Sequence, residues 1–375
     1  MSKIAIAADI VPTPSNIELF TEGDTARLIG DSLIERLRRA SFIVMNLETP
    51  LSDEACPIRK AGPCLIAPTK AISGLKAINP FFFTLANNHI LDQGDKGLYS
   101  TMNILGENHI GFAGAGKSLE EARKPYVVEI GGRKLGIYCC AEHEFSIAAN
   151  KKAGANPYDP LESFDDIKQL KEMCDYAIVL YHGGKELYRY PSPHLQKVFR
   201  KFADSGADIV VAQHTHCIGC KEDYKESTLV YGQGNFLFDH SKKKQWETSL
   251  IIELDLNTGI VDYVPLVKAG NGVREAKGAR GEQILMEFMR RSEEIKNEEF
   301  VREHYTRYAQ EIGNEYLMRF SGRIRRNLLV RFLGKLTSYR FIRHMYQEES
   351  RLSIKNILDC EAHRELASEV MAIHK

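Results

Sequence analysis

Short apolar runs alternate along the chain with longer stretches in which apolar residues recur every three or four positions. A short run bounded by turn residues is typical of a buried strand, whereas the longer spacing is typical of an amphipathic helix. The pattern therefore predicts strands that alternate with helices over much of the chain. The predicted strands are 3–10, 41–50, 81–89, 175–184 and 207–216, and β-rich segments follow at 227–238, 248–257 and 259–268.

Helical spacing fills most of the intervals, and Gly131 and Gly132 mark a hairpin turn within 126–142. Strands that alternate with helices are typical of a layered α/β sandwich. In open α/β sheets, ligands gather at the carboxyl ends of the strands. The predicted helices are 23–40, 70–80, 94–109, 164–174 and 192–206.

The character of the chain changes after Pro265, because no proline follows and the spacing becomes helical throughout. Segment 282–315 is rich in glutamate, whereas 316–347 carries many arginines and lysines and no acidic residue. We therefore expect two parts, an α/β domain over 1–272 and a helical, partly basic region over 273–375.

Composition excludes some classes of protein. Apolar residues make up 43% of the 375 residues, which is enough for a sizeable core, and the formal net charge is zero. A neutral chain is not expected to bind nucleic acid over its whole surface. The N-terminal apolar run is too short for a secretory signal, and no stretch approaches the roughly 20 apolar residues of a membrane helix. We expect a cytoplasmic protein.

Polar side chains follow the predicted strands, and many are of types that bind metal ions. The carboxyl ends of strands converge on one edge of a layered sheet, so these side chains are expected to meet. Imidazoles, carboxylates and an amide oxygen suit a pair of divalent cations, which can hold a bridging hydroxide and polarise a substrate oxygen. The expected metal ligands are Asp9, Glu48, Asn88, His182, His214 and His216.

Each of these side chains also has a simpler explanation. A single histidine at a strand end is usually a satisfied polar cap, and Asp9 or Glu48 can serve a turn. The pair His214 and His216 carries more weight, because residues two apart on a strand face the same side. The metal hypothesis therefore rests on the whole set and not on any one member.

Five motifs occur in order along the chain: NLETPL, LANNHILDQGDKGL, YHGGKE, GADIVVAQHTH and LVYGQGNFLFD. Their order resembles the CapA family, whose members are linked to poly-γ-glutamate and capsule synthesis. That family is similar to the calcineurin-like metallophosphoesterase superfamily. The resemblance covers about residues 3–268 and implies a four-layer α/β/β/α metallophosphatase-like sandwich, here followed by a C-terminal α-helical appendage.

The resemblance also implies roles for individual residues. Asp9 matches the first ligand motif, but Val11 stands where the superfamily has a histidine, so one metal site lacks a ligand. Glu48 takes the place of a bridging aspartate. His89 matches the group that protonates a leaving oxygen, and Asp92 is placed to orient it. The remaining ligand positions are matched by Asn88, His182, His214 and His216.

Five further residues are candidates for contact with substrate. The glycine-rich segment 232–236 either places Asn235 near a bound anion or forms only a tight turn beside the site. Lys185 and Arg189 can contact a carboxylate or phosphate, although a solvated loop explains them as well. The candidate substrate-binding residues are Asn46, Asn87, Lys185, Arg189 and Asn235.

Two functions fit these features. The first is a metal-dependent hydrolase in which a metal-activated hydroxide attacks a phosphoester or γ-glutamyl amide of an anionic small molecule or polymer. Its cofactor is expected to be one or two divalent ions of manganese, zinc, iron or magnesium. The second is a non-catalytic accessory subunit of a capsule-polymer assembly that keeps a degenerate metal pocket, which Val11 favours.

The basic segment 316–347 has apolar residues at spacings of three and four, with arginines at many of the other positions. Such a helix can lie on an anionic membrane or an acidic partner, or it can dock on the α/β domain through its apolar stripe. We expect capsule-polymer synthesis proteins as partners, peripheral membrane contact as one use of this segment, and no nucleic acid. The apolar positions are Leu317, Phe320, Ile324, Leu328, Phe332 and Leu336.

Overall fold

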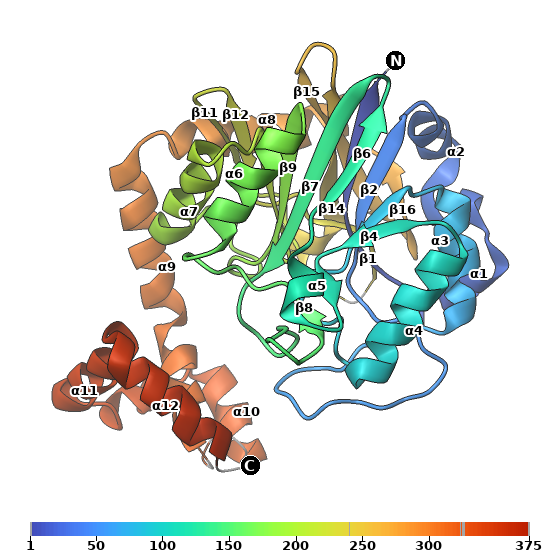
Figure 1. The fold of residues 1–375 in the computed structure, drawn as a ribbon. Coiled ribbons are helices and arrows are strands. Elements are labelled where there is room, and N and C mark those ends of the chain that lie inside the picture. Colours follow the sequence, from blue (N-terminus) through green and yellow to red (C-terminus); the bar gives the residue numbers. More distant parts are fainter. Residues whose placement is uncertain (1, 240, 323, 325–326, 374–375) are drawn as a thin grey trace. The chain divides into compact units, whose positions relative to one another are not determined.

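The computed structural model describes residues 2–239, 241–322, 324 and 327–373 (Figure 1). The chain forms two compact units, residues 1–301 and 302–375. The boundary after residue 272 stays a prediction, but in the structure the first compact unit continues to Val301. It does so because helix α8 (Gly278–Glu294) packs against strand β15 (Val261–Ala269) and brings the chain back onto the sheet.

The larger sheet of the first unit has parallel strands at its centre. Strand β1 pairs in parallel with β2 and β13, and β2, β3 and β4 continue the parallel part. Strands β14, β15 and β16 extend the sheet in antiparallel fashion. Along β16–β15–β14–β1–β2–β3–β4 the bounds are Gly272–Glu275, Val261–Ala269, Thr248–Asp255, Lys3–Val11, Phe42–Leu47, Phe82–Thr84 and Gly111–Ala113, and β13 is Asn235–Phe238.

The second sheet is mixed as well. Its strands β7, β9, β10 and β12 run parallel, and β6 and β11 are antiparallel edges. The predicted hairpin is confirmed, because Ile130 pairs with Arg133 and the two glycines between them have φ of 58° and 78°. Along β11–β12–β10–β9–β7–β6 the bounds are Lys221–Tyr224, Ser227–Val230, Ile209–Gln213, Tyr176–His182, Arg133–Ala141 and Tyr126–Ile130, and a small pair joins β5 (Ala115–Gly116) to β8 (Gly154–Ala155).

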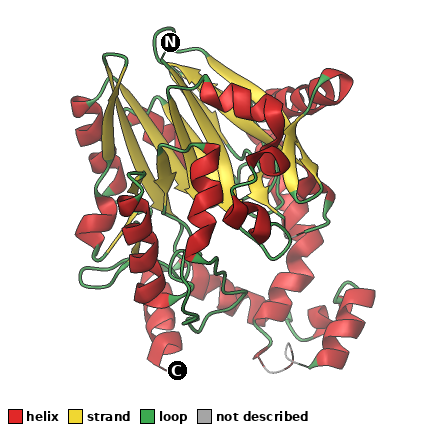
Figure 2. Cartoon of the chain, turned by 90° about the vertical axis from the view of Figure 1, so that its right-hand side faces the viewer, coloured by secondary structure: helices red, strands yellow, loops and turns green. Residues whose placement is uncertain are grey.

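The second sheet is buried on both faces, and alternate residues of one strand serve different cores. Ile178 and Leu180 of β9 join the core shared with the larger sheet, whereas Val179 and Tyr181 join the core under helices α6 and α7. Helices also cover the larger sheet, for α2 packs against β16. The first unit is thus a sandwich of helices, two sheets and helices (Figure 2), which confirms the predicted fold class.

Helices connect most of the parallel strands of the first unit. In α7 the predicted start is confirmed, because Pro193 is its first residue and the Ser192 side chain accepts a hydrogen bond from the Leu195 amide. The helices are α1 (Ile17–Glu22), α2 (Thr25–Arg38), η1 (Thr69–Ala71), α3 (Ile72–Ile78), α4 (Gly94–Glu107), α5 (Leu119–Arg123), α6 (Ser163–Met173), α7 (Pro193–Asp204), η2 (Lys244–Glu247) and α8.

The β-rich segment 227–238 divides between the two sheets. Its first half is β12 of the second sheet, and its second half is β13 of the larger sheet. Gly232 and Gly234 make the crossing possible, because their φ values of 137° and 78° are strained for other residues. The glycine-rich motif therefore carries the chain from one sheet to the other beside the strand ends.

The second unit is helical. Helix α9 (Glu298–Arg319) enters it and is followed by α10 (Leu328–Leu336), η4 (Arg340–His344), α11 (Glu348–Asp359) and α12 (Glu361–Ile373). Of the predicted basic segment 316–347, residues 323, 325 and 326 lie outside the described residues. Among the helices that the structure describes, none is both long and apolar enough to span a bilayer.

Candidate metal centre

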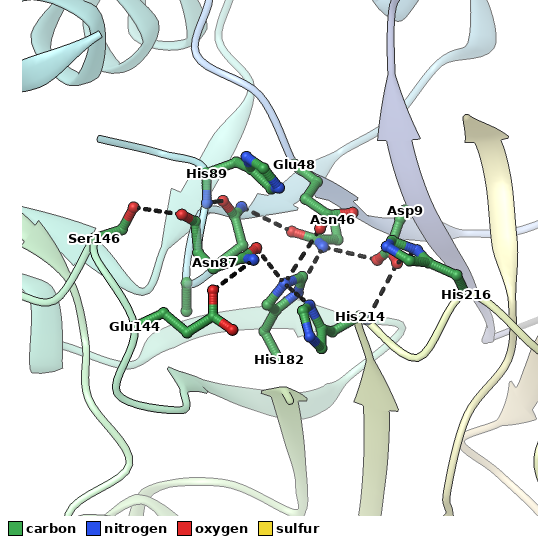
Figure 3. A network of polar contacts seen from close by, with 12 residues as sticks. Asp9, Asn46, Glu48, Asn87, His89, Glu144, Ser146, His182, His214 and His216 are labelled. Atoms are coloured by element: carbon green, nitrogen blue, oxygen red, sulfur yellow. Dashed lines mark hydrogen bonds and ion pairs between the residues drawn. The ribbon is translucent and has the colours of Figure 1, made fainter. Parts of the chain in front are cut away.

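The side chains predicted as metal ligands converge at the carboxyl ends of the strands (Figure 3). Asp9 and Glu48 come from the larger sheet, and His182, His214 and His216 come from the smaller one. Ligand atoms of Glu48, His182 and His214 lie within 4.8 Å of one another, as do those of Asp9, Glu48 and His216. Glu48 belongs to both groups and so links them.

The surroundings of His182 suit a shared cation. Its Nε2 lies 3.0 Å from Asn88 Oδ1, 3.2 Å from His214 Nδ1 and 3.4 Å from Glu48 Oε1. One imidazole nitrogen can donate only one proton among these neighbours. Atoms that each lie about 2.1 Å from one cation stand roughly 3.0–3.4 Å apart, so these spacings fit ligands of a common ion.

The carboxylate of Glu48 is the strongest single indication that the cluster is suited to a cation. Glu48 is 0% exposed, and neither of its carboxylate oxygens has a hydrogen-bond partner among the described residues. An unpaired buried carboxylate is costly, and proteins normally pair such a group or use it to bind a metal. The donor set of two carboxylates, three imidazoles and an amide fits a divalent cation.

Burial sets the protonation of the cluster. Burial, followed by the nearby Glu48 charge, raises the pKa of Asp9 to about 7, and burial also raises the pKa of Glu48. Burial lowers the pKa of His182 and His214 well below the usual value, so both rings are neutral near pH 7. Neutral imidazoles are the form that binds metal, and a cation would offset the two buried carboxylates.

The prediction that the two histidines of the His-Thr-His sequence lie on a regular strand was wrong. Strand β10 ends at Gln213, so His214 and His216 are not alternate residues of a strand. Both have left-handed backbones, with φ of 80° and 52°. Such conformations are strained for non-glycine residues and are concentrated at functional sites. The turn, and not the strand period, points both rings at the cluster.

The loop geometry is held by partners from the larger sheet. The His214 amide donates to Asp9 Oδ2 at 3.1 Å, and His216 Nδ1 lies 2.9 Å from Asn235 Oδ1. The His216 ring also lies 4.5 Å from the Trp246 ring, measured between centroids. Asn235 was predicted to contact substrate, and here it orients His216; substrate contact stays a prediction.

Asn88 is oriented by an acidic residue that the sequence analysis missed. Its Nδ2 donates to Glu144 Oε2 at 2.9 Å, which turns Oδ1 toward His182. Glu144 lies in an irregular segment between β7 and β8, 56 positions away in the chain. No spacing or motif could have connected the two residues before the fold was known.

Asn46 and Asn87 lie beneath the cluster and brace it. Asn46 Nδ2 donates to Asp9 Oδ1 at 2.8 Å, and Asn87 Nδ2 donates to Asn46 Oδ1 at 3.1 Å. Asn46 Nδ2 also lies 3.1 Å from His182 Nδ1. A cation on Nε2 of His182 would need the ring proton on Nδ1, so this contact must change upon loading. Both asparagines are fully buried, and their predicted contact with substrate stays a prediction.

His89 stands beside the cluster with two charged neighbours. Its Nδ1 lies 2.6 Å from Asp92 Oδ2, as expected for an aspartate that orients the ring. Lys60 Nζ forms an ion pair with Asp92 Oδ1 and lies 3.3 Å from His89 Nδ1. One nitrogen cannot both donate to Asp92 and accept from Lys60. The shorter distance indicates that Nδ1 carries a proton and donates a hydrogen bond to Asp92. Nε2 is then the ring nitrogen that can exchange a proton with a substrate.

Lys60 is the residue that sequence reasoning overlooked most clearly. It lies in an irregular loop between β2 and η1, yet its side chain is only 2% exposed and its partner Asp92 is 0% exposed. Phe145 covers the ammonium group at 5.8 Å from the ring centroid. A lysine in a polar loop carries no pattern that predicts burial, so only the fold reveals it.

The two basic candidates for substrate contact lie in different surroundings. Lys185 is half-buried, and its charge acts on His214, so it lies near the cluster. Arg189 donates from Nη1 to the Ile218 backbone oxygen at 2.9 Å and lines a small cavity with Arg291. The predicted substrate contacts of both residues stay predictions.

Two solved structures are similar to part of this chain. A hypothetical protein from Thermus thermophilus matches 73% of this chain and 100% of its own with a TM-score of 0.45 and 13% identity. A novel phosphatase from Mycoplasma pneumoniae matches 77% of this chain and 99% of its own with a TM-score of 0.44 and 15% identity. At these scores the matches carry no functional argument.

Curated relatives are more informative. The chain is 27% identical over 241 residues to the capsule biosynthesis protein CapA of Bacillus anthracis, covering 61% of this chain and 59% of that one. It is 27% identical over 244 residues to the PGA biosynthesis protein CapA of Bacillus subtilis strain 168, covering 63% of each. The chain thus spans about 60% of the length of these relatives.

A family model described as bacterial capsule synthesis protein PGA_cap matches residues 3–240. That match covers more than half of the 375 residues and includes every residue of the candidate metal centre. It also includes Val11, so the missing histidine lies inside the matched region and not beyond its edge. The chain therefore belongs to the bacterial capsule synthesis protein family PGA_cap.

Proposed function

We propose that the chain is a metal-dependent hydrolase that cleaves an ester or amide bond of an anionic substrate during the making or trimming of a capsule-type polymer. The observation that carries the proposal is the buried carboxylate of Glu48, which belongs to both groups of potential metal ligands and has no hydrogen-bond partner among the described residues. A buried carboxylate without a hydrogen bond destabilises the fold, so packing alone does not explain this residue at the strand ends of the two sheets.

The ligands would be Glu48, His182, His214 and Asn88 on one side and Asp9, Glu48 and His216 on the other. A bound divalent cation would supply Lewis acidity toward water and a substrate oxygen. Val11, buried at the end of β1, offers no ligand on the Asp9 side. We therefore propose one firmly held cation near His182 and weaker occupancy near Asp9.

The chain's own residues would move the proton that hydrolysis requires. His89 holds one ring proton at Nδ1 in its hydrogen bond to Asp92. With a second proton on Nε2, the imidazolium ring would donate that proton to a leaving alkoxide or amine and return to the neutral form. The contact between Lys60 and Asp92 holds that carboxylate in place beside the ring. Lys185 lies near enough to attract an anionic group of the substrate.

Purified protein tests this proposal by metal analysis and by hydrolysis assays with added manganese. The substrates are a generic aryl phosphate and poly-γ-glutamate, which represent the ester and amide possibilities. We expect bound divalent metal in the wild type and its loss in His214→Ala. We expect His89→Ala to keep the metal but lose at least about 100-fold in activity, which is typical when a general acid is removed.

A matched control is His109→Ala, because that histidine is exposed in the turn after α4 and forms no hydrogen bond or ion pair with the candidate ligands among the described residues. It should leave both metal content and activity unchanged. A wild type without any divalent metal would refute the proposal. Full activity in His89→Ala would refute the role of that residue alone.

A second candidate function is a non-catalytic accessory subunit that keeps a degenerate metal pocket. The observation in its favour is Val11, whose buried apolar side chain replaces a ligand expected from the superfamily. Bound metal without turnover of either substrate, together with retention by immobilised polymer, would favour this function over the hydrolase.

We also propose that the protein works with capsule-polymer synthesis proteins, as the names of its curated relatives suggest. The apolar side chains of α10 support a further contact, because Leu328, Phe332 and Leu336 are 77%, 62% and 69% exposed. A helix with exposed apolar and basic residues can attach to an anionic membrane surface. If α10 instead docks on the α/β domain, its serine variants should sediment with vesicles as the wild type does.

A further inference from the structure

A second concave site is lined in part by the segment that follows His216. It is a cavity of about 90 Å³ whose lining comes from the loop after β9, the loop after β10, η2, β14 and α8. We call it the Arg291 cavity. Its charged lining is strongly basic and consists of Arg189, Lys244, Arg280 and Arg291, with Glu287 as its carboxylate.

Arg291 is buried without close compensation of its charge. Its side chain is 4% exposed, and its Nε donates to the Gly219 backbone oxygen at 2.7 Å. The carboxylate nearest to it in the described structure is that of Glu287, which stands 3.9 Å away and is 49% exposed. A neutral carbonyl and one half-exposed carboxylate at 3.9 Å offset the buried guanidinium charge only in part.

Arg189 lines the same cavity and is tethered in a similar way. It uses Nη1 to donate to the Ile218 backbone oxygen at 2.9 Å, and no carboxylate of the described residues forms an ion pair with it. Burial and then the Arg189 charge lower the pKa of Arg291, as expected for two guanidinium groups that share one cavity. Each is tethered through one nitrogen to a backbone oxygen, which leaves further N–H donors for a ligand.

A purely structural explanation covers only part of these observations. Arg291 can be interpreted as a brace for the Gly219 carbonyl, because the two are hydrogen-bonded. That interpretation gives no reason for Arg189, Lys244 and Arg280 to line the same small cavity. Arg280 donates only to the neutral side chain of Gln283, at 3.1 Å, among the described residues. The cavity therefore contains more positive charges than the local hydrogen bonds account for.

We propose that the Arg291 cavity binds an oxyanion, the phosphate or carboxylate group of a ligand, through its guanidinium donors. Arginine forks suit both groups because they donate two parallel hydrogen bonds. The cavity has room for about three water molecules at about 30 Å³ each, which matches one anionic group and not a whole nucleotide. The recognised unit is thus a single anionic group.

The position of the cavity links it to the proposed substrate. Ile218 follows His216 by two residues, and Lys244 and Thr248 flank Trp246, whose ring lies 4.5 Å from that of His216. An extended anion with one group at the metal centre can therefore place another group in the Arg291 cavity. This link rests on the proposed function, whereas anion binding by the cavity does not.

Calorimetric titration of the full chain in the presence of a chelator tests the cavity without the metal. Inorganic phosphate and a γ-linked glutamate oligomer are the two probes. We expect at least one to bind, and Arg189→Gln and Arg280→Gln each to weaken that binding by about tenfold, as expected for loss of a charge-assisted contact. Binding of inorganic phosphate alone would identify the ligand group as a phosphate. Binding of the glutamate oligomer alone would identify it as a carboxylate.

The matched control is Arg290→Gln, since Arg290 lies next to Arg291 on α8 but is 58% exposed and ion-paired with Glu294. It should bind both probes as the wild type does. Thermal melting curves show whether each variant is folded. No binding of either probe by the wild type, or equal weakening in the control, would overturn the proposal. Loss of hydrolysis in His89→Ala with unchanged probe binding would separate the two sites.

Discussion

Glu48 shows at the scale of one residue how function can oppose stability. Its two buried oxygens have no hydrogen-bond partner among the described residues, and their contact with His182 is 3.4 Å long, so replacing the charge removes a cost without breaking a hydrogen bond. We expect Glu48→Gln to stabilise the metal-free protein near pH 8 by about 1 kcal/mol or more. The same variant should lose most of its affinity for divalent metal.

Thermal melting with a chelator and with added manganese measures both effects. The manganese-induced rise in melting temperature should be large in the wild type and small in Glu48→Gln. A variant that is less stable than the wild type without metal would show that Glu48 is satisfied by some other group.

Asp9 makes the stability of the metal-free protein depend on pH. Its pKa is raised from 3.8 in the unfolded chain to about 7 in the fold, chiefly by burial. The folded state therefore holds more protons than the unfolded state between about pH 4 and pH 7, and stability falls as the pH rises through that window. We expect the wild type to lose stability relative to Asp9→Asn over this range, measured by urea unfolding in a chelator.

Lys60 and Asp92 form a buried ion pair whose halves depend on each other. With side chains 2% and 0% exposed, removing one partner leaves the other charge buried and alone. We expect Lys60→Met to cost about 3–5 kcal/mol, and the double variant with Asp92→Asn to cost less than the sum of the single changes. Lys96→Met is the control, because Lys96 is 68% exposed and pairs with exposed Glu54. A loss below about 1 kcal/mol in urea unfolding of Lys60→Met would contradict this expectation.

At the scale of elements, close packing of helices on the larger sheet depends on small residues. A Cβ on Gly74 of α3 would lie 2.5 Å from the Cα of Phe20 in α1, which is backbone and cannot yield easily. We expect Gly74→Ala to cost about 1–3 kcal/mol, because the two helices must separate. Gly106 near the end of α4 has nothing within 4 Å of such a Cβ, so Gly106→Ala should stabilise by about 0.5–1 kcal/mol. Similar melting temperatures for both variants would refute this contrast.

The sequence could predict elements better than it could predict contacts. The apolar runs identify β1 and β9, and the glycine pair identifies the β6–β7 turn, because local periodicity and turn chemistry decide these features. His214 and His216 were placed in the correct cluster for the wrong reason, since left-handed backbones replaced the expected strand.

Other parts of the site had no local signal at all. Lys60 and Glu144 lie in irregular segments, and their partners Asp92 and Asn88 are distant in the chain. Tertiary packing alone decides which polar loop residue becomes buried beside a catalytic candidate. Motif order could therefore predict which candidate ligands lie together, but it could not predict the residues that orient them.

At the scale of the whole molecule, the C-terminal unit offers a surface that the candidate metal centre does not need. Replacing the exposed Leu328, Phe332 and Leu336 of α10 by serine should reduce co-sedimentation with vesicles that contain phosphatidylglycerol. Vesicles of phosphatidylcholine alone should retain little protein. Leu366→Ser and Met371→Ser in α12 form the control, because these residues are 65% and 79% exposed without the basic segment around them. Equal sedimentation of all variants would exclude α10 as an attachment site.

The hydrogen bond from His214 to Asp9 joins residues 205 positions apart, and it sets when the centre can exist during synthesis. A ribosome must release both sheets before the first carboxylate meets the last imidazole. Shorter nascent chains would carry these side chains apart, without the arrangement that we propose for a metal site. Capture of the proposed cation would therefore be a late event that follows closure of the two-sheet sandwich.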